Sequence, residues 1–250
     1  MTLALLALLA LGVAPAFAAP VGSAPEGVVH AMPGGLQAGA GAPAAPVADT
    51  TITIGRLQYG GGGDWYANPS ALPNLLASIR ERTGLPVAQR EVTVTPLDPR
   101  LRDYPFLYMT GHGNVSFTAR EREALRDYLL SGGFLHADDN YGMDEHFRRE
   151  MAALFPDREM VELPADHPVF HTHYSFPKGL PKIHEHDGLP PEAWGIFHDG
   201  RLVVFYTYET DLGNGWEDEA VHGNPPEVRE EALRMGVNLY LFAISQLSPR

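Results

Sequence analysis

The sequence predicts an α/β domain of three layers, in which helices cover both faces of a mainly parallel sheet. One observation is the repeated alternation of strand-like apolar runs with amphipathic helical patterns between residues 51 and 246. Another is the order strand, helix, strand between Pro105 and Gly142, because a helix of that length connects parallel strands by a right-handed crossover. A chain of 250 residues is also long enough for one domain with its own core.

The first 18 residues are typical of a secretory signal peptide. An apolar core runs from Leu3 to Val13 and is followed by Ala16-Phe17-Ala18, the A-x-A pattern of a cleavage site. No Lys or Arg precedes this core, which departs from the usual pattern, and an uncleaved apolar anchor is the alternative. We expect cleavage after Ala18, a secreted or periplasmic protein and, after cleavage, no membrane span. Residues 19–49, rich in Ala, Gly and Pro, are expected to form a disordered linker.

The predicted domain covers residues 51–247 and begins with two short strands on either side of a helix. Alternating β-branched residues predict the first strand at 51–59, and residues 91–94 repeat this pattern. The helix is predicted at 70–82, because Gly and Pro residues follow it and apolar residues recur on one face. These apolar residues are Leu72, Leu75, Leu76 and Ile79.

A strand-helix-strand unit forms the centre of the chain. The first strand is predicted at 106–110, where a short apolar run ends at a glycine. The helix is predicted at 118–130 and ends at Gly132-Gly133, since glycine is common just beyond a helix C-terminus. The second strand is predicted at 134–137 and is followed directly by acidic residues.

Two further helices and three strands are predicted in the second half of the chain. The helices are at 143–155 and 226–246, and the strands are at 160–162, 195–198 and 202–206. Asp199-Gly200 suits a tight hairpin turn between the last two strands. The connecting residues 163–192 and 207–224 are predicted to be irregular.

Polar residues follow both strands of the central unit. His112 lies between Gly111 and Gly113 after the first strand, and Asp138 and Asp139 follow the second. The carboxyl ends of parallel strands meet at one edge of the sheet, which is where open α/β sheets bind their ligands. We expect one aspartate to act as a general base or hard-metal ligand, with His112 as its partner. The alternative is that the aspartates only cap the next helix or bond the turn.

Two loops are expected to form the walls of the same site. The glycine run 60–63, followed by Asp64 and Trp65, is interpreted as a lid or an anion cradle. It lacks the Lys-Ser/Thr of a P-loop and the spacing of a dinucleotide fingerprint, and no cofactor is expected. After strand 202–206, an indole beside carboxylates is a frequent combination in carbohydrate sites. The candidate ligand-binding residues are Gly61, Asp64, Trp65, Gly111, Gly113, Asn140, Glu209, Asp211, Trp216 and Glu217.

Four histidines form two H-x-H pairs, His171 with His173 and His184 with His186. On a strand each pair would project from one face, in a geometry acceptable for Zn²⁺ or Cu²⁺. No third ligand is evident from the sequence, so these residues are candidates for a metal site only as an alternative. An exposed hairpin with incidental histidines explains the pattern equally.

Composition excludes several partners and reactions. The formal net charge is -13 and no Lys/Arg cluster offsets it, which argues against nucleic acid and anionic membrane surfaces as partners. The sequence has no cysteine, which excludes disulfides, thiolate metal sites and a cysteine nucleophile.

Three segments resemble the DUF4159 family, a domain family of unknown function: Tyr104–Gly113, Leu130–Asp139 and Asp211–Glu217. The layout is more distantly similar to the trehalose-utilisation (ThuA-like) branch of the class I glutamine amidotransferase-like superfamily. The resemblance covers about residues 51–246 and implies a flavodoxin-like fold with a site at the carboxyl edge. It implies no reaction, because amidotransferase chemistry needs a cysteine that this chain lacks.

The sequence therefore predicts a domain that binds a small polar ligand, with carbohydrates among the candidates. If the protein is an enzyme, we expect a hydrolase that uses Asp/His acid-base chemistry. Two alternatives stay open: a non-catalytic interaction module of an envelope assembly, and a metal-dependent hydrolase.

Overall fold

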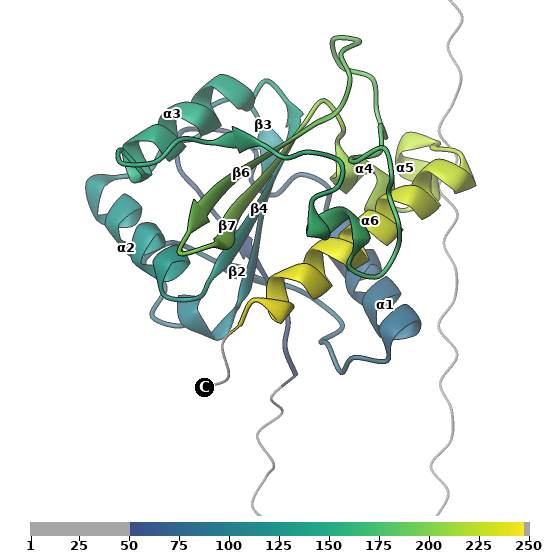
Figure 1. The fold of residues 1–250 in the computed structure, drawn as a ribbon, viewed down its shortest axis with the longest axis horizontal. Coiled ribbons are helices and arrows are strands. Elements are labelled where there is room, and N and C mark those ends of the chain that lie inside the picture. Colours follow the sequence, from purple (N-terminus) through teal and green to yellow (C-terminus); the bar gives the residue numbers. More distant parts are fainter. Residues whose placement is uncertain (1–50, 248–250) are drawn as a thin grey trace, which may run out of the picture. The chain divides into compact units, whose positions relative to one another are not determined.

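The computed structural model describes residues 51–247, and the predicted signal peptide and linker lie outside the described residues. The strands are β1 (Ile54–Leu57), β2 (Val92–Val94), β3 (Phe106–His112), β4 (Phe134–Tyr141), β5 (Val161–Glu162), β6 (Glu192–His198) and β7 (Arg201–Tyr208). The helices are α1 (Ala71–Thr83), α2 (Ala119–Leu130), α3 (Asp144–Leu154), α4 (Leu212–Trp216), α5 (Glu219–His222) and α6 (Pro226–Ser245). Figure 1 shows their arrangement.

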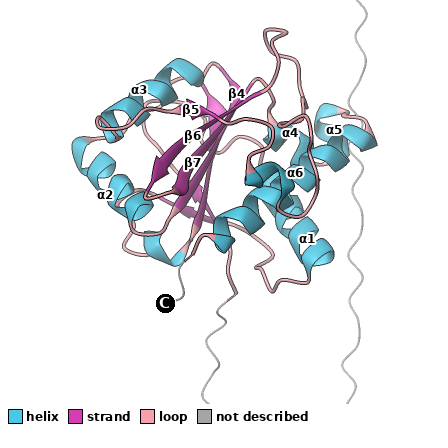
Figure 2. Cartoon of the chain, viewed as in Figure 1, coloured by secondary structure: helices cyan, strands magenta, loops and turns pink. Residues whose placement is uncertain are grey.

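A single seven-stranded sheet runs through the domain in the order β2-β1-β3-β4-β7-β6-β5. The strands from β2 to β7 in this order pair in parallel, whereas β6 and β5 are antiparallel additions at one side (Figure 2). The parallel part has the strand order of flavodoxin-like sheets, in which the chain goes first to one side of β1 and then to the other. The predicted mainly parallel α/β fold is therefore confirmed.

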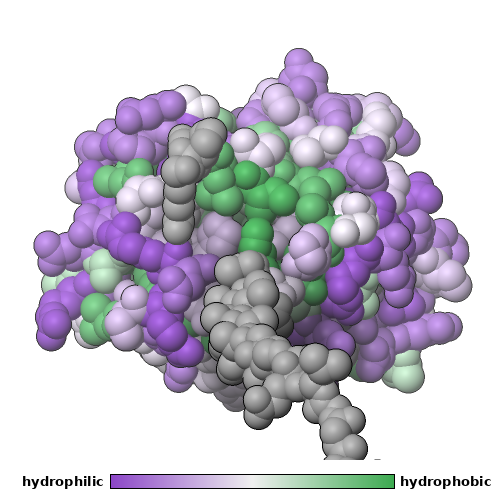
Figure 3. Space-filling view, turned by 90° about the horizontal axis from the view of Figure 1, so that it is seen from below, coloured by the Kyte–Doolittle hydropathy of each residue, from purple (hydrophilic) through white to green (hydrophobic). Residues whose placement is uncertain are grey.

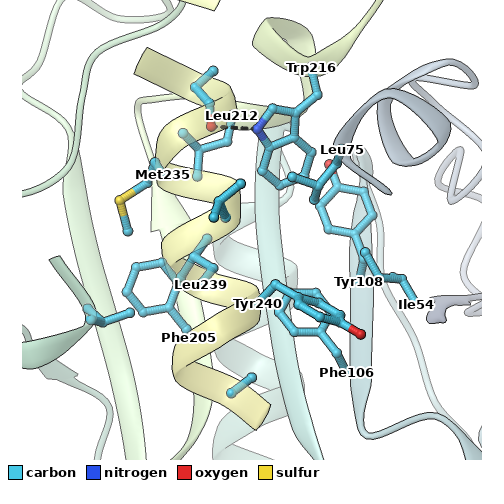
Figure 4. Close-up of a cluster of buried hydrophobic side chains, with 14 of the residues drawn as sticks. Ile54, Leu75, Phe106, Tyr108, Phe205, Leu212, Trp216, Met235, Leu239 and Tyr240 are labelled. Carbon is cyan, nitrogen blue, oxygen red and sulfur yellow. Dashed lines mark hydrogen bonds between the residues drawn. The ribbon is translucent and has the colours of Figure 1, made fainter. Parts of the chain in front are cut away.

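Helices cover both faces of the sheet and each face has its own hydrophobic core. On one face α1 and α6 pack over aromatic residues of the central strands, including Phe106, Tyr108 and Phe205 (Figure 4). On the other face α2 and α3 pack over a second cluster, which includes Leu107 and Leu135. Alternate residues of β3 thus serve opposite cores, as the twofold repeat of a strand requires.

The central unit follows its local signals closely. Helix α2 begins with a capping box, in which the Thr118 hydroxyl accepts from the N–H of Glu121 and the Glu121 carboxylate accepts from the N–H of Thr118. The helix ends before the two glycines, as predicted. Strand β4 is longer than predicted and continues to Tyr141, so Asp138 and Asp139 lie within the strand. Their hydrogen bonds, described below, explain why carboxylates are tolerated there.

The segments predicted to be irregular contain three short elements. Helices α4 and α5 form within residues 207–224, and a 3₁₀ turn forms at Pro168–His171. Neither H-x-H pair lies on a strand, because His171 ends this turn, His173 lies just after it, and residues 184–186 are irregular. The strand geometry that the metal alternative requires is therefore absent from both pairs.

The surface seen from below the view of Figure 1 has hydrophobic residues at its centre and hydrophilic residues around them (Figure 3). Large hydrophobic side chains that are exposed in the described part of the chain include Ile52, Leu97, Val161 and Leu247. Within residues 51–247, no helix has both the length and the apolar character that a membrane crossing requires.

A buried arginine in β1 fixes the loop before α1. Arg56 is 4% exposed, and its guanidinium donates to the carbonyls of Ala67 (2.8 Å) and Asn68 (3.2 Å). Its Nε lies 3.4 Å from the Glu91 carboxylate. Arg56 therefore attaches the loop that carries Asn68 to β1.

We predict that Arg56→Met lowers the free energy of unfolding by about 3 kcal/mol, because it leaves a carboxylate and two carbonyls without their donor. Urea denaturation followed by circular dichroism measures the change. Arg100→Met is the matched control, since Arg100 pairs with Asp98 at the surface and should leave the midpoint where it is. Equal midpoints for wild type and Arg56→Met would contradict this role.

Candidate functional site

A cavity of about 470 Å³ opens where β3 and β4 end and where the chain continues from β7 into α4. Figure 1 shows α4 and α5 beside these strand ends. The residues that line it all carry a polar group in their side chains: Asn68, His112, Asn140, Tyr141, His184, Glu185, His186, Asp211, Asn214 and His222. The cavity is therefore at the sheet edge where the topology places ligands.

His112 is held by a carboxylate from the glycine-rich loop. Asp64 accepts from the backbone N–H of His112 through Oδ1 (2.5 Å) and lies 3.0 Å from the ring Nδ1 through Oδ2. Burial opposes ionisation of Asp64, but these two bonds outweigh it and lower the pKa of its carboxyl. The ring is 55% exposed, and its Nε2 has no described partner. Asp64 thus fixes the orientation of an imidazole at the rim of the cavity.

The approach of Asp64 requires glycine at position 111. Gly111 has φ of +145°, and a Cβ there would collide with the Tyr59 hydroxyl and come within 3.0 Å of the Asp64 carboxylate. The loop itself pairs with the segment after β3, since Gly60 and Ser116 exchange backbone hydrogen bonds at 3.1 and 2.9 Å. The glycine run therefore serves as a close-packed support, and Gly61 and Gly113 are absent from the cavity lining.

A second carboxylate–histidine pair closes the far end of the site. The Glu217 carboxylate lies 2.9 Å from Nε2 of His222 and also accepts from the N–H and hydroxyl of Ser70, both at 3.1 Å. Glu217 is buried, whereas His222 lines the cavity from the end of α5. Its Nδ1 is the ring nitrogen that Glu217 leaves free.

His186 and Asp211 form a third, buried pair. The ring Nε2 lies 3.6 Å from Asp211 Oδ2, which is an ion-pair distance and longer than a hydrogen bond. Burial favours the neutral ring, but the negative charges of Asp211, Asp139 and Glu209 outweigh it and raise the pKa of His186. Asp211 also caps α4 by accepting from the N–H of Asn214 at 3.2 Å.

The backbone after β7 is strained around this pair. Glu209 and Asp211 have positive φ angles of 58° and 57°, a conformation that non-glycine residues rarely adopt. Glu209 is buried and accepts from Lys182 Nζ (2.9 Å) and from the N–H of Asp187 (3.2 Å). It therefore attaches the loop 182–187, which carries His184 and His186, to the end of the sheet.

Asp138 lies beneath the cavity and is fully buried. Its carboxylate accepts from the N–H groups of Gly213 (2.7 Å) and Leu212 (3.2 Å) and from the hydroxyls of Thr207 (2.5 Å) and Tyr108 (3.3 Å). Burial, and then the nearby charge of Asp211, raise its pKa to about 7. With these four donors Asp138 fixes the start of α4, and it does not line the cavity.

Asp139 and Asn140 point to different surroundings. Asp139 accepts from the N–H of Met143 at 3.0 Å and so supports the turn into α3; burial raises its pKa to about 6. Asn140 lines the cavity and accepts from the Thr110 hydroxyl at 2.7 Å. Its amide exchanges two long hydrogen bonds of 3.4 Å with Asn68. These asparagines present amide groups to the cavity from β4 and from the loop before α1.

The two candidate tryptophans do not reach the cavity. Trp216 is 0% exposed and packs beside Leu75 and Tyr108, with its Nε1 donating to the Ala232 carbonyl at 2.7 Å (Figure 4). Trp65 packs against the core on the other face of the sheet and contacts Tyr66 edge-on. Neither indole is therefore placed to stack on a ligand in this cavity.

Of the four histidines in the H-x-H pairs, the structure brings His184 and His186 to the cavity, with ring centroids 5.6 Å apart. His171 instead lies 2.9 Å from the Ala165 carbonyl, and His173 packs edge-on against Tyr174. Within residues 51–247, no three side chains of the metal-binding types are grouped closely enough to hold an ion.

Several lining residues were not expected from the sequence: Asn68, Tyr141, Glu185, Asn214 and His222. Tyr141 and Asn214 are sequence neighbours of candidate residues, so longer windows around those candidates would have included them. Asn68 and His222 gave no local signal. Arg56 holds the carbonyl of Asn68, and the Glu217 carboxylate that holds His222 is itself bound by Ser70, 147 positions away.

Comparison with known proteins gives one family. The model of DUF4159, described as a domain of unknown function, matches residues 53–244. No curated protein matches the chain. The more distant resemblance to the ThuA-like branch stays a prediction.

We predict that Asp138→Asn changes how stability depends on pH. Asp138 keeps its proton in the folded state at pH values where the unfolded chain has lost it, since its pKa rises from about 4 to about 7. Its contribution to the free energy of unfolding is therefore present at low pH and falls as the pH rises through this range.

Thermal unfolding between about pH 5 and about pH 8 tests the prediction. The loss of Tm with rising pH should be smaller in Asp138→Asn than in wild type. Part of the loss should remain in this variant, because Asp139 also has a raised pKa. Asp199→Asn, in the exposed turn between β6 and β7, is the control and should follow wild type. Parallel curves for wild type and Asp138→Asn would rule out the proposed protonation.

Proposed function

Because the chain belongs to the DUF4159 family, whose function is unknown, we propose its function from its own cavity: binding of a small, uncharged, polyhydroxylated ligand. The observation that carries the proposal is the lining itself, in which three asparagines and four histidines surround about 470 Å³ at the carboxyl edge of the sheet. Amides and imidazoles both donate and accept hydrogen bonds, as hydroxyl groups do. The volume lies within the range of small-molecule sites.

The charges of the residues around the cavity favour an uncharged ligand. No Lys or Arg is among the described residues that line the cavity, whereas Glu185 and Asp211 are. Asp138 and Asp139 lie just beneath. A phosphate or carboxylate would meet this negative surrounding without a Lys or Arg to pair with, which is unfavourable in a partly desolvated site. Carbohydrates and related polyols have the required chemistry, although the buried Trp216 supplies no stacking surface.

We also propose that the protein is exported, to the periplasm or to the medium. The support is the apolar core Leu3–Val13 followed by Ala16-Phe17-Ala18. Polyhydroxylated ligands of an exported protein would come from outside the cytoplasm.

We predict that a neutral sugar or polyol stabilises the protein by binding in the cavity. Thermal shift with glucose, galactose, sucrose and myo-inositol measures this, because a ligand that binds only the folded state raises Tm. Glucose 6-phosphate and inorganic phosphate serve as anionic counterparts and should give no increase.

Two histidine variants locate the binding. His184→Ala removes an exposed ring from the cavity lining and should reduce the Tm increase. His173→Ala removes an exposed ring outside that lining and should retain it. The proposal fails if no neutral compound raises Tm, or if His184→Ala and His173→Ala respond alike.

We predict that export removes residues 1–18. Expression of the whole chain in a Gram-negative host, followed by N-terminal sequencing of the periplasmic fraction, should give a mature protein that begins at Ala19. Ala18→Arg should prevent this processing, because cleavage requires a small residue before the cut. Retention of Met1 in the exported wild-type protein would contradict the prediction.

A further inference from the structure

Two histidines of the cavity share an arrangement that is typical of acid-base catalysts. His112 is held at Nδ1 by Asp64 at 3.0 Å, and His222 is held at Nε2 by Glu217 at 2.9 Å. In each pair the carboxylate fixes which ring nitrogen carries hydrogen, so that the other nitrogen is available to accept or donate a proton. Both rings line the same cavity, one from the end of β3 and the other from the end of α5.

Most carboxylates around the cavity are already engaged, whereas Glu185 is 74% exposed and lies 3.6 Å from Lys182 Nζ. Asp138 and Asp139 accept from backbone N–H groups, and Asp211 caps α4. Glycoside hydrolysis needs a pair of carboxyl groups that face the scissile bond, and the structure offers no such free pair among the described residues. We assign the acid-base roles to His112 and His222, because these are the two lining imidazoles that a carboxylate holds at hydrogen-bond distance.

The absence of Lys and Arg from the described lining narrows the choice of reaction further. Phosphoryl transfer depends on cationic groups that stabilise the transferred charge, and no Lys or Arg lines the described cavity. A neutral ester has no such requirement. Its carbonyl oxygen needs only hydrogen-bond donors, and the side-chain amides of Asn68 and Asn140 lie in the lining. Each amide has a second N–H beside the one in their mutual 3.4 Å contact.

We propose that this cavity hydrolyses esters of small polyhydroxylated alcohols, with His112 as general base and His222 as general acid. A water molecule gives a proton to Nε2 of His112 while its oxygen bonds to the ester carbonyl carbon. The electron pair of the C=O π bond moves to the carbonyl oxygen, which the asparagine amides stabilise. The carbonyl then re-forms and the bond to the alcohol oxygen breaks.

The leaving oxygen takes a proton from Nδ1 of the protonated His222. The products are an alcohol and a carboxylic acid, which ionises in water. His112 releases its proton to solvent and His222 regains one, so the protein returns to its initial state. Asp64 and Glu217 are positioning residues, because they act through the imidazoles that they hold.

The inference rests on the proposed function, and hydrolysis of p-nitrophenyl acetate by the whole chain, measured as p-nitrophenolate release across pH, tests it. We expect release well above that of buffer. His112→Ala should lower it about 100-fold, because general-base catalysis contributes factors of this order. Added imidazole should restore part of the rate in this variant.

Asp64→Asn separates positioning from support of the loop. It should lower kcat and leave KM close to the wild-type value, because a misoriented imidazole slows proton transfer without weakening substrate binding. A collapsed loop would raise KM as well. His173→Ala is the control and should match wild type, and the thermal unfolding of every variant shows that it is folded.

The outcomes distinguish the two proposals. Release no greater than in buffer, or equal release by wild type and His112→Ala, would overturn the inference even if a polyol raises Tm. Release that depends on His112, without any Tm increase from the neutral compounds, would support ester hydrolysis and overturn the polyhydroxylated ligand. A wild-type kcat in Asp64→Asn would remove Asp64 as the positioning residue.

Discussion

The hydrogen bonds of one buried carboxylate connect the centre of the sheet to the walls of the cavity. Asp138 lies in β4 and binds the N–H groups of Leu212 and Gly213, which begin α4. These hydrogen bonds fix the position of α4, which follows β7 in the chain. It also needs glycine at position 213, because a Cβ there would lie 2.5 Å from both Asn68 Nδ2 and the Tyr108 hydroxyl. Asn214 and the segment that leads to α5 take their positions from this anchor.

The sequence predicts most of the fold because the signals of its long elements are local. Apolar residues that recur every three or four positions identify α1, α2, α3 and α6, and short apolar runs identify the central strands. Helices α4 and α5 have no such pattern. Besides the local cap from Asp211, they depend on the Asp138 anchor and on burial of Trp216, which are contacts between distant parts of the chain.

The predicted topology identifies the sheet edge that carries the site, but it does not identify which residues bind one another there. His112 and the two aspartates were expected at one edge, and the structure places them there. Which carboxylate holds the imidazole depends on how a loop folds back, and the partner is Asp64 of the glycine-rich loop. Trp216 faces the core, where its indole N–H donates to the Ala232 carbonyl. The residues next to Trp216 in the sequence do not indicate this orientation.

The Ser70–Glu217 hydrogen bonds join residues 147 positions apart, and the cavity takes further side chains from the ends of β3, β4 and α5. Contacts of such long sequence separation form only after the intervening strands have paired. The cavity therefore exists only in the completely folded domain, and no fragment that ends before α5 contains it. A bound ligand would report completion of folding and would protect the whole sheet, including strands it never touches, against unfolding and proteolysis.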